Sequence, residues 1–506
     1  MQQLKSKFYR SAEGYTFVFW SIVIVGIVFI ASSHPMMKLR FDIWQHIGNI
    51  DILVFDPAAK IVRSNWHTTW AFFFRTLGVN DIFTYATIIH RVQFLLIGII
   101  IYYAAKLLFS ALLPTIELGD SNNKNNRKQW LSSLAISSVL VWFTVIGTVS
   151  TFQQAWIMWY SVNYQITLPL LFLALGLFVN AVSFAQSNNF IVIKIFSSLL
   201  LLALIYLYHA GELAYLVFYM PILLVCFCTK TNYKKTLILM AMIFIVVFVA
   251  AGFYTDIRPG LIKLLLDGNY SKIKDEINIH GAWNTEGNNR YLANWNELYA
   301  LSVFMAAPIA LLAWTKRNHV NQRVFLFIVL SLVFCFIPTF KYSAGLASLI
   351  SYDGIVNRYY FASFVFVLVP LGLYLVAYHF KVLQHPAALV LSVLLLMGLV
   401  FTYSKLLNKG GVYYQNVNSI RNSLYQDRVG IDMPATEIAS IGRQISAAQA
   451  QYGSDQVIYC ADYDKSHVVR YIYRQKNILF HRGFTYTLDE CRNYAKSLNK
   501  LPIVIN

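Results

Sequence analysis

The residues best suited to acid–base chemistry lie close together near the start of the chain. Asp42, Trp44 and His46 stand at alternating positions, and His67 follows in the same polar stretch. Asp42 comes shortly after an apolar run over residues 15–32, so we expect it at the boundary between membrane and water. A carboxylate at that boundary is partly desolvated and therefore accepts a proton more readily. The alternative is that Asp42 pairs with a neighbouring arginine or caps a helix, but the nearby Trp44 and His46 favour a functional role.

Arginines at the ends of apolar runs are candidates for contact with a phosphate. Arg358, followed by Tyr359, stands at the outer end of one run, and its planar fork suits bidentate contact with phosphate oxygens. The alternative is an interfacial anchor with aromatic neighbours. Arg91 stands just before the second predicted span and offers a further phosphate contact or an anchor for the helix end.

Four other residues are candidates for binding a substrate. His209 and Glu212 are three residues apart between two apolar runs, so they share a face if the helix continues. Ionisable residues at membrane depth are commonly functional, although a polar turn outside the membrane explains these two equally well. Trp283 and Arg290 offer an aromatic face and a charge, which together suit the binding of a sugar. The other residues of their loop are expected to face water.

The elements that must position these residues are mostly apolar helices. Of the 506 residues, 58% are apolar and 13% are charged, which is about half the charged share of a soluble protein. Because a helix needs about 20 apolar residues to cross a bilayer, the sequence predicts about eleven transmembrane helices, several of them short. They cover residues 15–32, 94–113, 131–149, 166–184, 192–208, 212–228, 236–254, 298–314, 324–340, 360–378 and 388–404.

Basic residues in the short connections predict the orientation. With the N-terminus in the cytoplasm, the loops 33–93 and 255–297 and the tail lie on the outer side. We expect a transmembrane domain over residues 1–404 and an outer domain over residues 405–506. The alternative for residues 192–228 is a single long span, which would reverse the orientation of everything after it.

The tail predicts a small α/β domain in which strands alternate with helices, as in a parallel sheet. Helix signals cover residues 435–452, 466–473 and 488–498, and strand-like runs cover residues 456–459, 478–481 and 501–505. The stretch from Thr487 to Glu490 predicts a capping box that opens the last of these helices. Cys460 and Cys491 form a disulfide if the tail lies in an oxidising compartment, the alternative being two unpaired thiols. In the first loop, residues 70–77 and 82–89 predict amphipathic helices along the membrane surface.

The architecture resembles that of the GT-C superfamily of membrane glycosyltransferases. The shared features are a long first outer loop with an aspartate soon after the first span, amphipathic helices, many spans and a C-terminal outer domain. The spacing Asp-x-Trp-x-His from Asp42 and the stretch Asn65-Trp66-His67 loosely match first-loop signatures of that group. Within it, the chain is most similar to the phage- and prophage-type (Gtr) O-antigen glucosyltransferases.

The resemblance implies an inverting transfer of a sugar, glucose in the most similar group, from a polyprenyl-phosphate donor. The acceptor would be lipopolysaccharide O-antigen or a related glycan on the periplasmic side of a bacterial inner membrane. Asp42 would be the general base, and Arg358 with Tyr359 would contact the donor phosphate. Metal-dependent relatives carry an acidic pair, whereas Asp42 has no acid two residues away, so we expect neither a metal nor another cofactor.

Two other classes remain as alternatives: an O-antigen polymerase or ligase, and a transporter of lipid-linked sugar. The sequence contains no glycine-rich phosphate loop and no dinucleotide fingerprint, which argues against a nucleotide-sugar donor and an ATP-driven pump. Lys and Arg total 41 against 23 for Asp and Glu. In a membrane protein this excess indicates loop orientation and contact with anionic lipid, and we expect no nucleic-acid partner.

Overall fold

The computed structural model describes most of the chain. The described residues are 42–58, 65–113, 124–144, 163–183, 188–227, 261–268, 270–286, 319–337, 341–350, 364–379, 386–406, 433–478 and 487–505, with single positions at 14, 19, 238, 241 and 245. The chain divides into two compact units, which are taken one at a time. The helical unit comprises Met1–Gly26, Leu95–Trp156 and Asn163–Asn416, and the α/β unit comprises Ile27–Phe94, Ile157–Val162 and Val417–Asn506.

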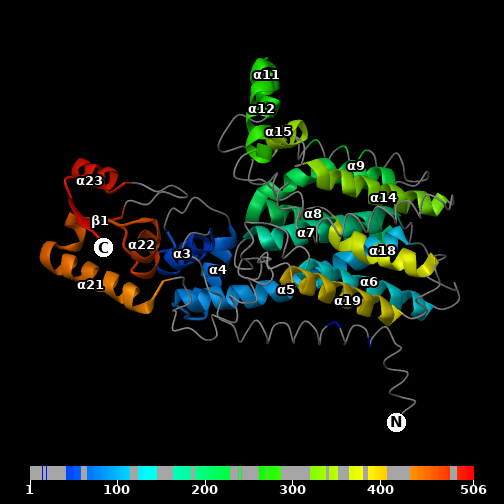
Figure 1. The fold of residues 1–506 in the computed structure, drawn as a ribbon, viewed down its shortest axis with the longest axis horizontal. Helices are drawn as coiled ribbons and strands as arrows, with labels where there is room; N and C mark the ends of the chain where they lie inside the picture. Colours follow the sequence, from blue (N-terminus) through cyan, green and yellow to red (C-terminus); the bar gives the residue numbers. More distant parts are fainter. Residues whose placement is uncertain are drawn as a thin grey trace, which may run out of the picture. The chain divides into compact units, whose positions relative to one another are not determined.

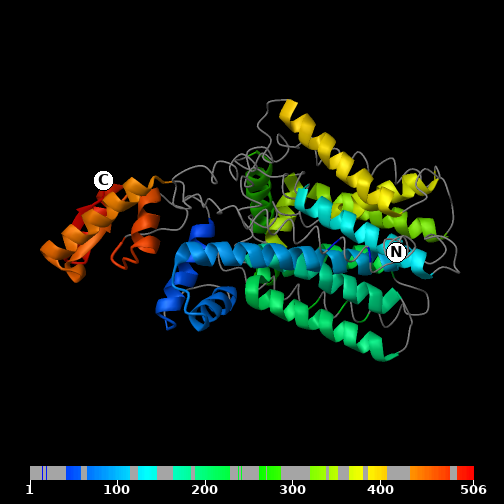
Figure 2. The same ribbon diagram turned by 90° about the horizontal axis from the view of Figure 1, so that it is seen from below.

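The helical unit is a bundle of apolar helices (Figures 1 and 2). Its described helices are the later part of α5 (Ile82–Leu112), α6 (Lys124–Thr144), α7 (Asn163–Ser183), α8 (Asn188–His209), the 3₁₀ helix η3 (Ala210–Tyr215), α9 (Leu216–Phe227), α11 (Leu261–Leu266), α12 (Tyr270–Glu286), α14 (His319–Phe336), α15 (Lys341–Ile350), α18 (Val365–His379) and α19 (Pro386–Leu406). Helix α7 packs along α8, α6 packs against both α18 and α19, α9 packs against α14, and α12 packs against α15.

Aromatic side chains fill much of the interior of this bundle. Trp142 on α6, Phe172 on α7 and Phe366 on α18 are buried and meet at ring-centroid distances of 4.7 to 5.8 Å. Aromatic pairs at such distances add attraction to the apolar area that they bury. The outer side of α8 differs, because a row of large apolar residues there is more than half exposed: Phe190, Ile193, Phe196 and Leu200. Their helical spacing produces an apolar stripe of the kind that lipid covers.

Three described helices are long and apolar enough to cross a membrane: Ile82–Leu112, Gln165–Val182 and Phe190–His209. Shorter apolar helices, such as Arg323–Phe334 and Val365–Leu375, coincide with predicted spans. The predicted spans 15–32, 236–254 and 298–314 lie outside the described residues except at single positions. The total of about eleven spans therefore stays a prediction, as do the domain boundary at residue 405 and the orientation.

The run 192–228 is interrupted at His209. This residue has extended backbone (φ −162°, ψ 92°), and the 3₁₀ helix η3 follows it before α9 begins. Figure 1 shows α9 lying beside α14 instead of extending α8 in line. The structure therefore contains two separate helices here, as the prediction of two spans requires.

The α/β unit combines first-loop helices with the C-terminal part of the chain. Its elements are α3 (Asp42–Phe55), α4 (Asn65–Thr76), the beginning of α5, α21 (Ala435–Tyr452), β1 (Val457–Cys460), α22 (Tyr463–His467), the π-helix η6 (Val468–Ile472), α23 (Leu488–Ser497) and β2 (Leu501–Val504). Strands β1 and β2 pair in parallel, with Val457 opposite Leu501 and Cys460 opposite Val504. The predicted parallel pairing is thus confirmed for these two strands.

Several predictions for this unit need correction. The predicted amphipathic helix 82–89 is not a separate element, because it forms the start of the continuous helix α5. The predicted helix 466–473 is divided between α22 and the π-turns of η6. Of the predicted strand 478–481, Ile478 forms an isolated parallel bridge with Tyr459, and the other residues lie outside the described ranges.

Candidate functional site

A buried pair of histidines joins the two first-loop helices. His46 on α3 and His67 on α4 lie 2.8 Å apart between Nδ1 and Nε2. Their rings are stacked, with an angle of 2° between the planes, and both side chains are buried. One imidazole nitrogen must donate and the other accept, so the tautomers of the two rings depend on each other. The sequence had named both residues as candidates, and the structure brings them together.

An indole fixes the orientation of this pair. Trp66 is buried and meets both histidine rings edge-on, at centroid distances of 5.9 Å and 5.1 Å. Its Nε1–H donates to Oε1 of Gln93 on α5 at 3.0 Å. Neither Trp66 nor Gln93 was predicted to act in the site. The sequence signal for Trp66 was its place in the stretch Asn65-Trp66-His67, and Gln93 had none beyond being a polar residue near the start of an apolar helix.

Asp42 is the first residue of α3, one helical turn before His46. Positions four apart occupy the same face of a helix, so the backbone places residue 42 on the face that carries His46. Trp44 also belongs to α3. The side chains of Asp42 and Trp44 lie outside the described part of the structure, so the role predicted for each stays a prediction.

A second polar cluster lies inside the helical unit, where α8 ends. The carboxylate of Glu212 is buried and is bonded to Nδ1 of His209. Thr167 on α7 donates its hydroxyl to Oε2 of Glu212 at 3.2 Å. Glu212 belongs to the 3₁₀ turn η3, yet its side chain is only 1% exposed, so a binding role and a polar turn outside the membrane both stay predictions. The helix does not continue between His209 and Glu212, yet the tight 3₁₀ turn still brings the two side chains together.

The other candidates are less fully described. Arg91 lies on α5 and is partly buried. Trp283 belongs to α12, but its side chain is not among those described. Arg290, Arg358 and Tyr359 lie outside the described residues, so the predicted phosphate site stays a prediction. Within the described ranges, no group of three or more His, Cys, Asp and Glu residues is placed to hold a metal ion.

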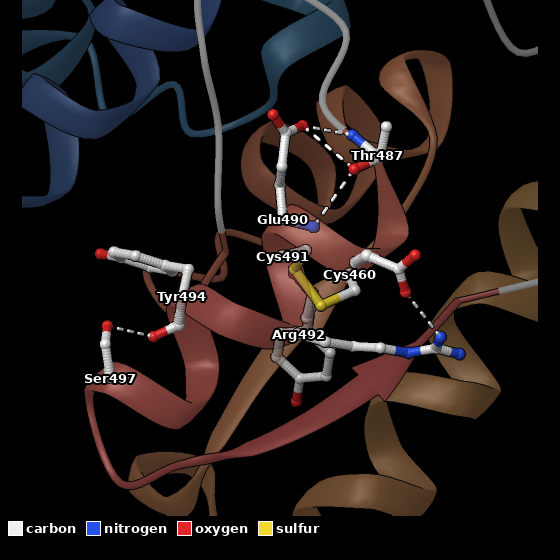
Figure 3. The surroundings of a disulfide bond; sticks show 9 residues. Cys460, Thr487, Glu490, Cys491, Arg492, Tyr494 and Ser497 are labelled. Atoms are coloured by element: carbon white, nitrogen blue, oxygen red, sulfur yellow. Dashed lines mark hydrogen bonds and ion pairs between the residues drawn. A yellow bond between two sulfur atoms is a disulfide. The ribbon is translucent and has the colours of Figure 1, made fainter.

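The C-terminal part contains the predicted disulfide between Cys460 and Cys491. The bond ties the end of β1 to the first turn of α23 (Figure 3). It lies in a core with Ile458 and Ala495. Thr487 caps this helix: its hydroxyl accepts from the backbone N–H of Glu490, whose carboxylate in turn accepts from the N–H of Thr487. Both the disulfide and the capping box were predicted, and both are confirmed.

A polar contact that the sequence did not reveal joins α3 to the C-terminal part. Arg474 donates to both carboxylate oxygens of Asp51, through Nε at 2.9 Å and Nη2 at 3.2 Å. Burial raises the pKa of Asp51 above its ordinary value, and the hydrogen bond and charge of Arg474 partly oppose that rise. The two residues are more than four hundred positions apart, so no local pattern could have paired them.

No protein-family model, curated protein or solved structure matches this chain.

Proposed function

We propose that this chain is an inverting membrane glycosyltransferase that transfers a sugar from a polyprenyl-phosphate donor to O-antigen or a related glycan. Glucose is the sugar that we propose. The observation that carries the proposal is the arrangement of the first-loop helices. An aspartate opens α3 one turn before a buried histidine pair, and both helices connect through Trp66 to α5, which is apolar enough to span a membrane.

In the proposed reaction, the Asp42 carboxylate takes the proton of an acceptor hydroxyl. The hydroxyl oxygen attacks the anomeric carbon from the side opposite the phosphate, so the new glycosidic bond forms as the bond to the polyprenyl phosphate breaks. Arg358, with Arg91, would stabilise the negative charge that develops on the departing phosphate. The hydrogen-bonded pair of His46 and His67 supports this scheme because it holds groups that can donate and accept a proton about one helical turn from residue 42.

We propose that Glu212, in the helical unit, contributes to sugar binding. Fixed by His209 and Thr167, it offers an acceptor for a sugar hydroxyl in surroundings where a hydrogen bond is strong. Trp283 and Arg290 are proposed as further contacts to the glycan. The disulfide supports a periplasmic location for the tail, because such bonds persist in oxidising compartments. The proposed location is a bacterial inner membrane, crossed several times, with the N-terminus in the cytoplasm.

Asp42→Asn tests the proposed reaction directly. The amide keeps the shape of the carboxylate but accepts no proton, so kcat should fall by about 100-fold or more. The measurement is transfer of radiolabelled glucose from polyprenyl phosphate glucose in membranes that carry the acceptor glycan. Asp455→Asn is the matched control, because Asp455 is exposed and distant in sequence from the first loop. Full transfer by Asp42→Asn would remove Asp42 from the mechanism.

The same membranes separate the two alternatives. An O-antigen polymerase or ligase would ignore the monosaccharide donor and consume an oligosaccharide on a pyrophosphate carrier. A transporter would move the lipid-linked sugar across the membrane without forming a glycosidic bond. Product formation from the monosaccharide donor alone therefore supports the proposed function over both.

A further inference from the structure

Arg474 makes several contacts with the first-loop segment at once. Beyond its two bonds to the Asp51 carboxylate, its Nη2 donates to the backbone carbonyl of Asn80 at 3.1 Å. Its guanidinium also lies over the ring of Phe55, at 3.8 Å from the ring centroid. Asp51 and Phe55 belong to α3, and Asn80 lies just before α5. A planar cation with five donors is suited to holding three such groups together.

A second contact brings the backbone of α3 against the C-terminal part. The ring of Tyr471, on η6, lies so close to Gly48 that a Cβ at that position would collide with it. Glycine normally weakens the interior of a helix. At position 48 it allows the aromatic ring to pack directly on the backbone of α3.

The backbone of Arg474 is itself unusual. Its φ is +53°, in the left-handed region that residues other than glycine rarely adopt. The flanking residues are anchored to α21, since the Tyr473 hydroxyl donates to the carbonyl of Ile438 and the Gln449 amide donates to the Gln475 side chain. An unfavourable backbone conformation persists where surrounding contacts impose it. Here it directs the guanidinium towards α3.

We propose that Arg474 and Tyr471 are positioning residues, which hold α3 on the C-terminal part of the chain. Arg474 contacts the C-terminal half of α3 and Tyr471 packs near its middle, whereas His46 lies near the N-terminus, where Asp42 begins the helix. A helix transmits a tilt or a shift along its whole length, so the docking fixes where the first turn lies. That docking matters for sugar transfer is an inference that rests on the proposed function.

The first experiment measures docking without reference to activity. Amide hydrogen exchange is followed across residues 46–55 in the full-length protein in lipid nanodiscs. Arg474→Gln leaves the Asp51 carboxylate buried without its cation, so protection of α3 should fall by roughly tenfold or more. Arg492→Gln is the matched control, because Arg492 forms an exposed pair with Asp489 on α23. The double variant Asp51→Asn with Arg474→Gln removes the buried charge and should recover part of the protection.

Gly48→Ala gives a second test, because the protection of a docked α3 and that of an undocked α3 should change in opposite directions. Alanine forms helix more readily than glycine, so an undocked α3 would become better protected. A docked α3 would become less protected, because the new Cβ meets the Tyr471 ring. Tyr471→Ala removes the clash as well as the ring, so adding Gly48→Ala to Tyr471→Ala should cause no further loss of protection. Raised protection in Gly48→Ala, or unchanged protection in Arg474→Gln, would overturn the proposal.

The second experiment asks whether the docking positions the reaction. In Arg474→Gln, kcat should fall by roughly 10- to 100-fold, as for a displaced catalytic group, with the donor KM within about twofold. Arg474→Lys keeps the charge without the fork and should restore part of kcat. Lost protection with unchanged kcat would overturn the positioning role. A native protein that transfers no sugar would refute the proposed function, while the exchange measurements would still decide the docking.

Discussion

At the scale of single residues, the described structure separates two kinds of histidine. His46 and His67 are buried together in a hydrogen-bonded pair that the sequence had named as functional. His467 is buried as well, but in the C-terminal part and beside Arg470. Burial, reinforced by that positive charge, lowers the pKa of His467 from 6.5 to about 4. This histidine is therefore neutral in the folded protein. It is better suited to making the stability depend on pH than to catalysis.

The depressed pKa of His467 predicts a loss of stability in acid. Its folded pKa is about 4 against 6.5 when unfolded, so between these values the unfolded chain binds the extra proton. The contribution of neutral His467 to the free energy of unfolding is complete above pH 6.5 and is lost as the pH falls through 4. It amounts to about 3 kcal/mol. The measurement is the free energy of unfolding of the C-terminal part, followed by amide hydrogen exchange or circular dichroism from pH 7 to pH 4.

His467→Asn isolates this contribution, because asparagine does not titrate. Asp51 titrates with the opposite sign: burial raises its folded pKa, so its contribution is lost as the pH rises. The difference between the native protein and His467→Asn removes this background. An equal acid sensitivity in both proteins would assign the effect to other groups.

At the scale of elements, the disulfide stabilises a C-terminal part whose hydrophobic core is small. The described sheet has two short strands, and the cluster around Cys460 and Cys491 is small. Isolated pairs of strands are only marginally stable. The bond closes 31 residues of chain and ties α23 to β1, the strand that precedes α22 and η6. Its integrity therefore affects the elements that carry Tyr471 and Arg474.

Loss of the disulfide should destabilise these elements measurably. Cys491→Ser should lower the free energy of unfolding by about 2–4 kcal/mol, since the cross-link restricts the unfolded chain. The measurement is thermal unfolding of the C-terminal part with and without dithiothreitol. Reduction should lower the Tm of the native protein and leave that of Cys491→Ser unchanged. A shift of equal size in both proteins would mean that another thiol is responsible.

Local sequence patterns predicted some elements to the residue and missed others. Helix 435–452 and the capping box at Thr487 are confirmed because both depend on neighbours within a few positions. Helix α3 was not predicted, although Ile43, Ile47, Ile50 and Val54 recur at helical spacing along it. The boundary between 82–89 and 94–113 was wrong, since a polar residue such as Gln93 is tolerated inside a helix when Trp66 bonds to it.

At the scale of the whole molecule, the proposal requires the first loop and the tail to lie on the same side of the membrane. The contacts of Asp51 and Gly48 with the C-terminal part are consistent with this requirement, because both segments belong to one compact unit. The positive-inside pattern reaches the same result from independent information.

Cysteine labelling in intact spheroplasts tests this topology. Asp455→Cys, in the exposed stretch before β1, should react with a membrane-impermeant maleimide added from outside. Lys128→Cys, exposed at the start of α6, should react only after lysis because it lies in a predicted cytoplasmic loop. The native protein is the control for background labelling. The reverse pattern would place the disulfide in the cytoplasm and contradict the proposed location.

The sequence by itself determined the apolar helical character of the chain and the main elements of the tail, and it offered the break near His209 and the pairing of Cys460 with Cys491, each beside an alternative. These features depend on composition, on periodicity or on a small set of cysteines, which neighbouring residues make visible. Only the tertiary structure decided that His46 meets His67, that Glu212 is buried, and that Arg474 holds Asp51. Such contacts join residues that are remote in the chain, and their energy comes from burial and geometry that no single segment contains.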